Sequence, residues 1–243
     1  KFVDRCIFNL KPEYLDYLRI YEKNLKERNK ILKDLSEKNF FYIEGKNIEK
    51  DLWLKKIEEI LVNEGLKIFQ ERIKFSNDFN ALSNNSMNFP KIQIFLTGKI
   101  EKFLVSQDID SVKKIYLQKL HKSRKIDSIK GSISYGPNKS DLKVIFLKKR
   151  LLAEKCSTGE QKIILISLIV QFCKLMNNKK NFPILLLDEI VAHLDNKIRS
   201  SLFEELKTLK NQVWMSGTGI SLFSSIIKDK KVVNLEIEDL LKQ

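Results

Sequence analysis

The stretch from Ile184 to Glu189 constrains the fold of this chain more than any other. Four aliphatic residues run directly into two adjacent carboxylates, Asp188 and Glu189. The pattern is typical of a buried strand in a parallel sheet, which ends where ligands bind in α/β folds. An aspartate there can hold Mg²⁺, directly or through water, and the next glutamate can orient or deprotonate an attacking water. The alternative is a strand that simply ends in charged turn residues.

Helices and strands alternate around this stretch and predict an α/β fold with a parallel sheet. The segment from Gly159 to Met176 is apolar on nearly every side, so we expect a buried helix. Residues 232–243 are expected to add a strand and a terminal helix. The four elements predicted after residue 150 are a helix at 159–177, a strand at 184–188, a helix at 195–210 and a strand at 212–216.

The first part of the chain has the apolar spacing of amphipathic helices. It predicts a lobe of antiparallel helices within residues 1–90 and an α/β lobe at residues 91–243. The predicted elements of this part are helices at 11–35 and 49–75, a linker at 76–90, a strand within 91–100, a helix at 110–124 with Asp110 as its N-cap, and two strands joined by a turn within 131–150.

The chain is strongly basic, with 45 Lys and Arg residues against 31 Asp and Glu and a net charge of +14. Such a charge favours an anionic partner, and nucleic acid is the partner we expect. The lysines are spread along the sequence and do not gather in one segment. A compositional bias towards lysine is therefore the alternative explanation of the charge.

Cysteine use and hydropathy narrow the class of protein further. The three cysteines, Cys6, Cys156 and Cys173, are far apart and have no metal-binding spacing, which favours reduced thiols in a cytoplasm. The apolar run from Ile163 to Val170 is well short of the roughly 20 residues that span a bilayer. We therefore expect no membrane partner.

A second motif, Cys156 to Lys162, opens the buried helix. Ser157 followed three residues later by Glu160 is the pattern of a capping box, and Gly159 allows close approach to the backbone. A helix N-terminus with a free hydroxyl and exposed amides can bind an anion. An ordinary capped helix is the alternative.

The order of these motifs resembles that of ABC-type ATPases. Asp188 matches the magnesium-coordinating carboxylate of the Walker B motif, and Glu189 matches the catalytic glutamate. Asp195 also suits the N-cap of the next helix. The matching segments are Ser157, Thr158, Gly159, Glu160 and Gln161 for the signature motif, and Ala192, His193, Leu194 and Asp195 for the D-loop.

Four further segments resemble the RecF family of bacterial recombination and repair ATPases. The family element Gly-Pro-His-Arg-Asp-Asp-Leu is matched at Gly136, Pro137, Asp141 and Leu142. Asn138 stands in place of His and Lys139 in place of Arg. The other three segments are KFVDRCIF at 1–8, YEKNLKERNKIL at 21–32, and QVWMSGTG at 212–219. Residues 36–130 match only loosely.

Two departures from the ATPase pattern bear on the function. Transporters of this superfamily carry a switch histidine at the place where this chain has Ser216, Gly217 and Thr218. RecF proteins also have small residues at this place. The sequence also has no phosphate-binding loop of the form Gly-x-x-x-x-Gly-Lys-Ser or Gly-x-x-x-x-Gly-Lys-Thr. In the family that loop and the glutamine loop precede a segment like KFVDR, so we expect a missing N-terminal portion to hold both. Without its strands, apolar sheet surface should be exposed.

The resemblance implies an α/β ABC-type ATPase head, here its C-terminal part, with an inserted helical arm lobe. It implies ATP and Mg²⁺ as cofactors and an ATP-dependent homodimer. In that dimer the signature acts in trans, while Asp188 and Glu189 act in cis. The implied partners are DNA at single-strand/duplex junctions, RecO and RecR, with RecA loading as the outcome. We expect weak ATPase activity in the complete protein and none in residues 1–243 alone.

Three other functions are considered as alternatives to a RecF-like ATPase. A non-hydrolysing DNA-binding scaffold that keeps the ATPase fold is the main alternative. An SMC-like chromosome ATPase would need long coiled-coil heptads, and the helices before residue 76 are too short for them. A transporter subunit is disfavoured by the absent switch histidine.

Overall fold

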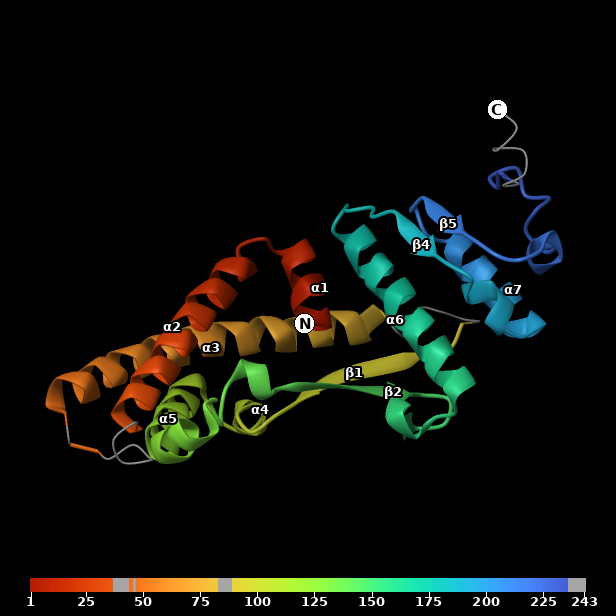
Figure 1. Ribbon diagram of the computed structural model, residues 1–243. Helices are drawn as coiled ribbons and strands as arrows, with labels where there is room; N and C mark the ends of the chain where they lie inside the picture. Colours follow the sequence, from red (N-terminus) through yellow and green to blue (C-terminus); the bar gives the residue numbers. More distant parts are fainter. Residues whose placement is uncertain (37–43, 46, 83–88, 236–243) are drawn as a thin grey trace. The chain divides into compact units, whose positions relative to one another are not determined.

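The computed structural model describes residues 1–36, 44–45, 47–82 and 89–235. The chain forms two compact units (Figure 1): the first comprises Lys1–Asp78 and Ile94–Lys143, and the second comprises Phe79–Gln93 and Val144–Gln243. The chain passes from one unit to the other at three places: within helix α3 (Ile48–Leu82), within strand β1 (Ile92–Thr97) and within strand β2 (Asp141–Phe146). The division into lobes at residues 1–90 and 91–243 stays a prediction, and the compact units divide the chain at other places.

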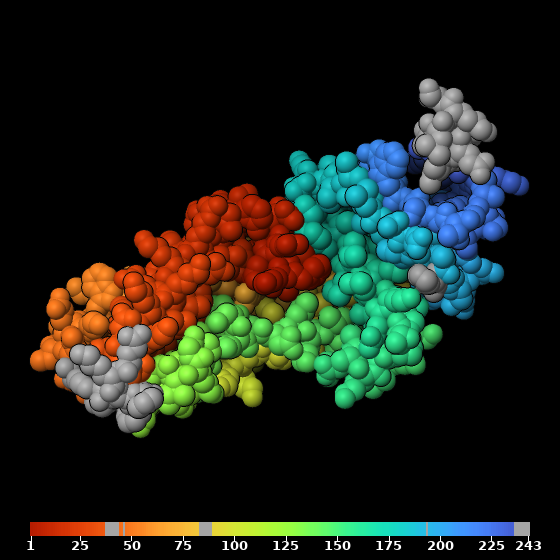
Figure 2. Space-filling view, viewed as in Figure 1, coloured from red at the N-terminus to blue at the C-terminus, as the bar shows by residue number. Residues whose placement is uncertain are grey.

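The first unit is mainly helical. In the space-filling view the side chains of α1 and α2 form one continuous surface (Figure 2). The helices of this unit are α1 (Phe2–Leu10), α2 (Tyr14–Ser36), α3 (Ile48–Leu82), α4 (Glu101–Leu104), α5 (Ile109–Lys130) and the 3-10 turn η2 (Pro137–Lys139); the strands are β1 (Ile92–Thr97) and β2 (Asp141–Phe146), which lead into the second unit.

Helices α2 and α3 are antiparallel, as predicted. Arg28 pairs with Glu58 in their middle, whereas Lys11, just before α2, pairs with Glu71 further along α3. The contacts thus run in opposite directions along the two sequences. Apolar and aromatic side chains fill the space between the helices, including Tyr21 and Phe69, both at most 2% exposed.

A fully buried ionic network joins α2, α3 and α5. The Arg28 guanidinium donates to Glu58 Oε1, Asp127 Oδ2 and the Leu120 carbonyl oxygen, each at 2.9 Å. Arg124 donates to both oxygens of Glu58, at 3.0 and 2.7 Å. Burying a charge is costly unless it is paired and hydrogen-bonded. The two arginines and two carboxylates therefore favour only those arrangements of α2, α3 and α5 in which every charge keeps its partners.

The second unit is the predicted α/β part. Strands β4 and β5 pair in parallel, with Leu187 opposite Met215. Helix α6 packs on them and buries nine of its residues, whereas Leu186 and Trp214 on the two strands are 71% and 49% exposed. The expected exposed apolar sheet surface is therefore present. The elements are β3 (Leu151–Leu152), which pairs antiparallel with the end of β2, η3 (Ala153–Lys155), α6 (Thr158–Asn178), β4 (Leu185–Leu187), η4 (Ile190–His193), α7 (Asn196–Lys207), β5 (Val213–Met215) and η5 (Ile220–Phe223).

Four expectations need correction. Within residues 131–150, all of which the structure describes, one strand forms, β2, and the strand that pairs with it, β3, begins at Leu151. The N-cap of α5 is Asp108, whose side chain accepts a hydrogen bond from the Ser111 amide, and Asp110 lies inside the helix. The linker predicted at 76–90 is wrong for residues 76–82, because α3 continues to Leu82; residues 83–88 lie outside the described part. No regular strand forms at 232–235, and residues 236–243 also lie outside the described part.

Candidate functional site

Strands β4 and β5 bring Asp188, Glu189 and Ser216 together at their carboxyl ends. The Ser216 hydroxyl donates to Asp188 Oδ1 at 2.5 Å and accepts a hydrogen bond from the Glu189 amide at 2.9 Å. The Ser216 amide also donates to the Leu187 carbonyl oxygen at 3.1 Å, which extends the parallel ladder by one residue. One serine of the predicted switch region therefore fixes the predicted magnesium ligand Asp188 and the predicted catalytic residue Glu189 relative to each other.

The backbone at Glu189 is strained. Its φ of 51° and ψ of 9° place it in the left-handed region, where a residue with a side chain costs about 1–2 kcal/mol. Backbone strain of this kind concentrates at functional positions. Here it turns the chain sharply after β4 and leaves both carboxylates exposed to solvent.

The signature segment forms the N-terminus of α6, as predicted. Ser157 is the N-cap, and it forms a full capping box with Glu160. The other oxygen of Glu160 pairs with Lys149 at 2.7 Å. The hydrogen bond from Lys149 lowers the pKa of Glu160, with a further contribution from the Ser157 amide, so the carboxylate stays charged. The carboxylate lies beside the first amides of the helix, where a negative charge is favourable.

The rest of the signature faces outward. A Cβ added to Gly159 would meet no described atom within 4 Å, so packing within this chain does not require a glycine there. The Gln161 side chain donates to the carbonyl oxygens of Ala153 and Cys156, both at 3.1 Å, and ties the helix to the preceding turn. Within the described ranges, no hydrogen bond or ion pair joins residues 157–161 to Asp188, Glu189 or Ser216.

The predicted D-loop begins at Ala192, shortly after Glu189. Ala192 and His193 lie in the turn η4, and Leu194 is buried in the core. Asp195 is the N-cap of α7, as predicted, because its Oδ1 accepts a hydrogen bond from the Ile198 amide at 2.9 Å.

The last two residues of the switch region, Gly217 and Thr218, are exposed beyond β5. A Cβ at Gly217 would lie 2.9 Å from Cε2 of Phe223. The close approach of this ring explains why a glycine stands at position 217.

The donors at Asp188 fit Mg²⁺, which prefers carboxylate, hydroxyl and water oxygens and usually takes one or two carboxylates plus substrate phosphates. Asp188 is exposed and bonded to a hydroxyl, so it matches that set. The described ranges contain no group of three or more His, Cys, Asp or Glu side chains that could hold a metal by themselves. The ion would therefore depend on nucleotide phosphates as well as on Asp188.

The other family motif, Gly136 to Asp141, lies in the first unit against the helical arm. Gly136 has a φ of +140°, and a Cβ there would lie 2.1 Å from the Tyr21 hydroxyl oxygen and 2.8 Å from that of Tyr116. Tyr21 also donates to Asn138 Oδ1 at 3.5 Å. Two segments far apart in the sequence, both typical of the family, are therefore packed on each other.

Arg72 links the same motif to the start of the chain. It donates to the Pro137 carbonyl oxygen at 2.6 Å and to both oxygens of Asp4, at 2.9 and 3.0 Å. Burial by itself would raise the pKa of Asp4, but the Arg72 charge and hydrogen bonds from Tyr14 and Arg72 outweigh this and lower it. Arg72 and Lys149 were not predicted from the sequence, because neither lies in a motif.

Gly136→Ala should destabilise the first unit, because backbone strain alone costs about 1–3 kcal/mol and the new methyl group meets the Tyr21 hydroxyl. Urea unfolding measures the loss. Gly131→Ala is the control: its φ is +63° but it faces open space, so only the backbone cost of about 1–2 kcal/mol applies. Tyr21→Phe in the Gly136→Ala background should recover part of the loss. Equal effects of the two glycine substitutions would contradict the contact.

The fold and the order of motifs define the class of protein: the C-terminal part of an ABC-type ATPase head with a helical arm. Solved structures of the recombination mediator protein RecF with ATPrS and with ATP share this fold, with TM-scores of 0.71 and 0.69 at 21% and 22% identity. Each match covers 90% of this chain and 57% of the solved chain. No family model matches the chain.

The sequence comparison is more specific. The DNA replication and repair protein RecF of Rickettsia canadensis is 33% identical over 237 residues, which are 97% of this chain and 62% of the relative. RecF of Rickettsia bellii is 34% identical over 223 residues, 90% of this chain and 58% of the relative. Over nearly its whole length the chain is similar to RecF proteins, and it spans about 60% of the length of these relatives. Throughout the described ranges, no helix is both long and apolar enough to cross a membrane.

Proposed function

We propose that this chain is the arm and the C-terminal half of the head of an ATP-dependent DNA-binding protein that acts in recombinational repair and replication. The observation that carries the proposal is the hydrogen-bonded arrangement of Asp188, Glu189 and Ser216 at the carboxyl ends of two parallel strands. Ligands of open α/β sheets bind at this edge. The relatives' name supplies the biological context.

In the proposed site, Asp188 holds Mg²⁺ on the phosphates of ATP, and Glu189 orients or deprotonates the attacking water. Ser216 positions both residues and takes the place of the transporter histidine. The signature residues, with their capped helix N-terminus, bind the γ-phosphate of the nucleotide held by the partner subunit. The open space at Gly159 supports this, because a glycine that its own chain does not need leaves room for a ligand or a second subunit.

ATP-driven dimerisation would then clamp DNA, and hydrolysis would release it. The net charge of +14 supports a DNA partner. The RecFOR pathway named for the solved neighbours supports RecO and RecR as the proposed protein partners. Gapped DNA as the substrate and RecA loading as the outcome are proposed on the family resemblance alone.

Binding of the full-length protein to gapped duplex DNA, measured with and without ATP over a range of salt concentrations, tests the proposal. We expect ATP to raise the affinity for DNA. Salt-sensitive binding that ATP does not change would instead support a non-hydrolysing scaffold that keeps the ATPase fold.

Ser157→Arg tests the role of the signature in trans. The substitution places a long cation at the exposed N-terminus of α6, so it should block ATP-dependent dimerisation of the full-length protein while each monomer still binds ATP. Ultracentrifugation and nucleotide-binding measurements separate the two effects. Ser157→Thr keeps the capping hydroxyl and serves as the control. A Ser157→Arg protein that dimerises normally with ATP would rule out the trans role.

A further inference from the structure

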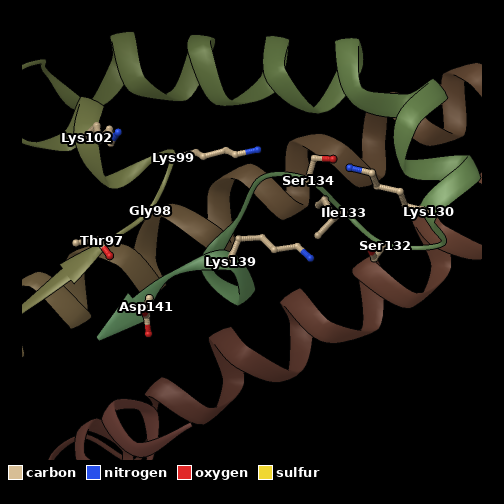
Figure 3. Close-up of a pocket in the computed structure, with 10 residues that line it drawn as sticks. All are labelled: Thr97, Gly98, Lys99, Lys102, Lys130, Ser132, Ile133, Ser134, Lys139 and Asp141. Atoms are coloured by element: carbon tan, nitrogen blue, oxygen red, sulfur yellow. The ribbon is translucent and has the colours of Figure 1, made fainter. Parts of the chain in front are cut away.

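The first unit contains a cavity of about 520 Å³ whose charged lining residues are four lysines and one aspartate (Figure 3). Four of its lining residues are lysines from four different segments: Lys99 after β1, Lys102 in α4, Lys130 at the end of α5, and Lys139 in the family motif. The sequence suggested that lysines are scattered. The fold instead brings residues up to 40 positions apart around one hollow.

Three of the lysines converge on the cavity. The side chains of Lys99, Lys130 and Lys139 extend towards the space around Ser134 and Ile133 (Figure 3). Lys99 is held on one side by the Tyr135 ring, whose centre lies 4.8 Å from its ammonium nitrogen. Within the described part of the chain, none of the four lysines pairs with a carboxylate, so their charges are available to a ligand.

The carboxylates near the cavity have other partners or are shielded. Asp141, the one acidic residue of the lining, pairs with Lys143 at 3.1 Å. Asp127 accepts hydrogen bonds from Arg28, Ser123 and Ser134. Glu101 is 6% exposed, and its carboxylate lies against the Gly98 backbone.

Hydroxyl donors complete the lining. Thr97 and Ser132 face the cavity, and among the described residues neither hydroxyl has a hydrogen-bond acceptor. Several ammonium groups with short hydroxyl donors, and no unpaired carboxylate among the lining residues, are the chemistry that binds a phosphate group. A phosphodiester suits a cavity that is open to solvent, because it needs contacts on one side only and the strand continues past it.

We propose that this cavity binds a backbone phosphate of DNA, and that the family motif around Gly136 serves to present Lys139 to it. The inference rests on the proposed DNA-binding function and adds to it a particular phosphate site on the helical unit. It gives a role to the family motif around Gly136, which lies in the first unit, whereas Asp188 and Glu189 lie in the second.

Lysine footprinting on the 243-residue chain tests the site directly. The chain is acetylated with sulfo-NHS-acetate alone, with a gapped DNA duplex, with ATP, or with inorganic phosphate, and the rate at each lysine is measured by mass spectrometry. DNA should slow acetylation of Lys99, Lys130 and Lys139 several-fold. It should leave Lys23, Lys26 and Lys30, exposed on α2 of the same unit, much less affected.

A variant pair adds a quantitative test. Replacing Lys99, Lys130 and Lys139 with Gln should weaken DNA binding about tenfold. It should also lower the slope of log affinity against log salt by about 0.9 for each DNA phosphate that is no longer neutralised. Replacing Lys23, Lys26 and Lys30 with Gln removes the same charge and should change both values much less. Thermal melting confirms that each variant is folded.

The outcomes are distinct. If DNA binds but the cavity lysines react at their free rate, or if both triple variants behave alike, the phosphate site is wrong and the proposed function stands. If the chain binds no DNA, both fail together. If ATP or inorganic phosphate protects the three lysines and DNA does not, the site holds a free phosphate compound, and the assignment to DNA is overturned.

Discussion

Arg28→Met should lower the free energy of unfolding of the first unit by about 3–5 kcal/mol, because it removes one partner from a buried ionic network. Arg28 is 0% exposed and contacts Glu58, Asp127 and the Leu120 carbonyl oxygen. Methionine has a similar volume, so the loss reports the charge and its hydrogen bonds more than a cavity. Glu58 keeps Arg124 as a partner, whereas Asp127 would keep only neutral donors, Ser123 and Ser134.

Urea unfolding followed by circular dichroism and by Trp53 fluorescence measures this loss, since Trp53 lies on α3 and donates to Glu27 of α2. A Trp214→Phe background removes the signal of the tryptophan in the second unit. Arg19→Met is the matched control. Arg19 lies on the same helix, but its side chain is 70% exposed and its pair with Asp16 spans 3.7 Å. Such pairs contribute about 0–1 kcal/mol. If the two variants lost similar stability, the network would not hold the arm together as proposed.

The network also explains one part of the family resemblance. Tyr21 and Arg28 belong to the arm segment that resembles RecF, and both are buried: Tyr21 against the Gly136 motif, and Arg28 against α3 and α5. Burial raises the pKa of Tyr21 to about 12, so its hydroxyl stays neutral at physiological pH. The arm motif therefore serves packing, and its tyrosine and arginine need no ligand to account for them.

Local signals predicted the second unit well. The capping box at Ser157, the N-cap at Asp195 and the aliphatic run before Asp188 each depend on a few neighbouring residues, and all three are present in the structure. Strand alternation with helices also predicted the parallel pairing of β4 and β5.

The errors arose where distant contacts decide the local structure. The Asn- and Ser-rich end of α3 suggested a linker, but Phe75 and Phe79 continue the helical spacing and are buried. Ser76 also donates to the Ile94 carbonyl oxygen at 2.9 Å, which joins α3 to β1. Tertiary packing thus outweighs a composition that favours a loop.

The side-chain clusters could not be predicted from the sequence for the same reason. The role of Ser216 depends on the register that places it one residue past the Leu187–Met215 pair, and no spacing in the sequence reveals that register. The cavity lysines are separated by two helices and a turn. Only the fold of the first unit shows that these lysines, far apart in the sequence, lie around one cavity.

Glu189→Gln is the second large expected effect. In the full-length protein it should lower ATP turnover by about 100-fold or more, which is the usual contribution of a general base or water-orienting group. Glutamine has nearly the same shape, and the left-handed backbone at position 189 and its hydrogen bond to Ser216 do not depend on the carboxylate. ATP affinity, measured by fluorescent-nucleotide titration, should therefore remain nearly unchanged.

Glu204→Gln makes the same chemical change on α7, where Glu204 pairs with Lys207 on the surface, and should leave turnover as it was. The Glu189→Gln protein should also remain on DNA longer in the presence of ATP, because release is proposed to follow hydrolysis. Normal turnover with Glu189→Gln would contradict the catalytic assignment. Slow turnover without longer residence on DNA would keep that assignment and separate hydrolysis from DNA release.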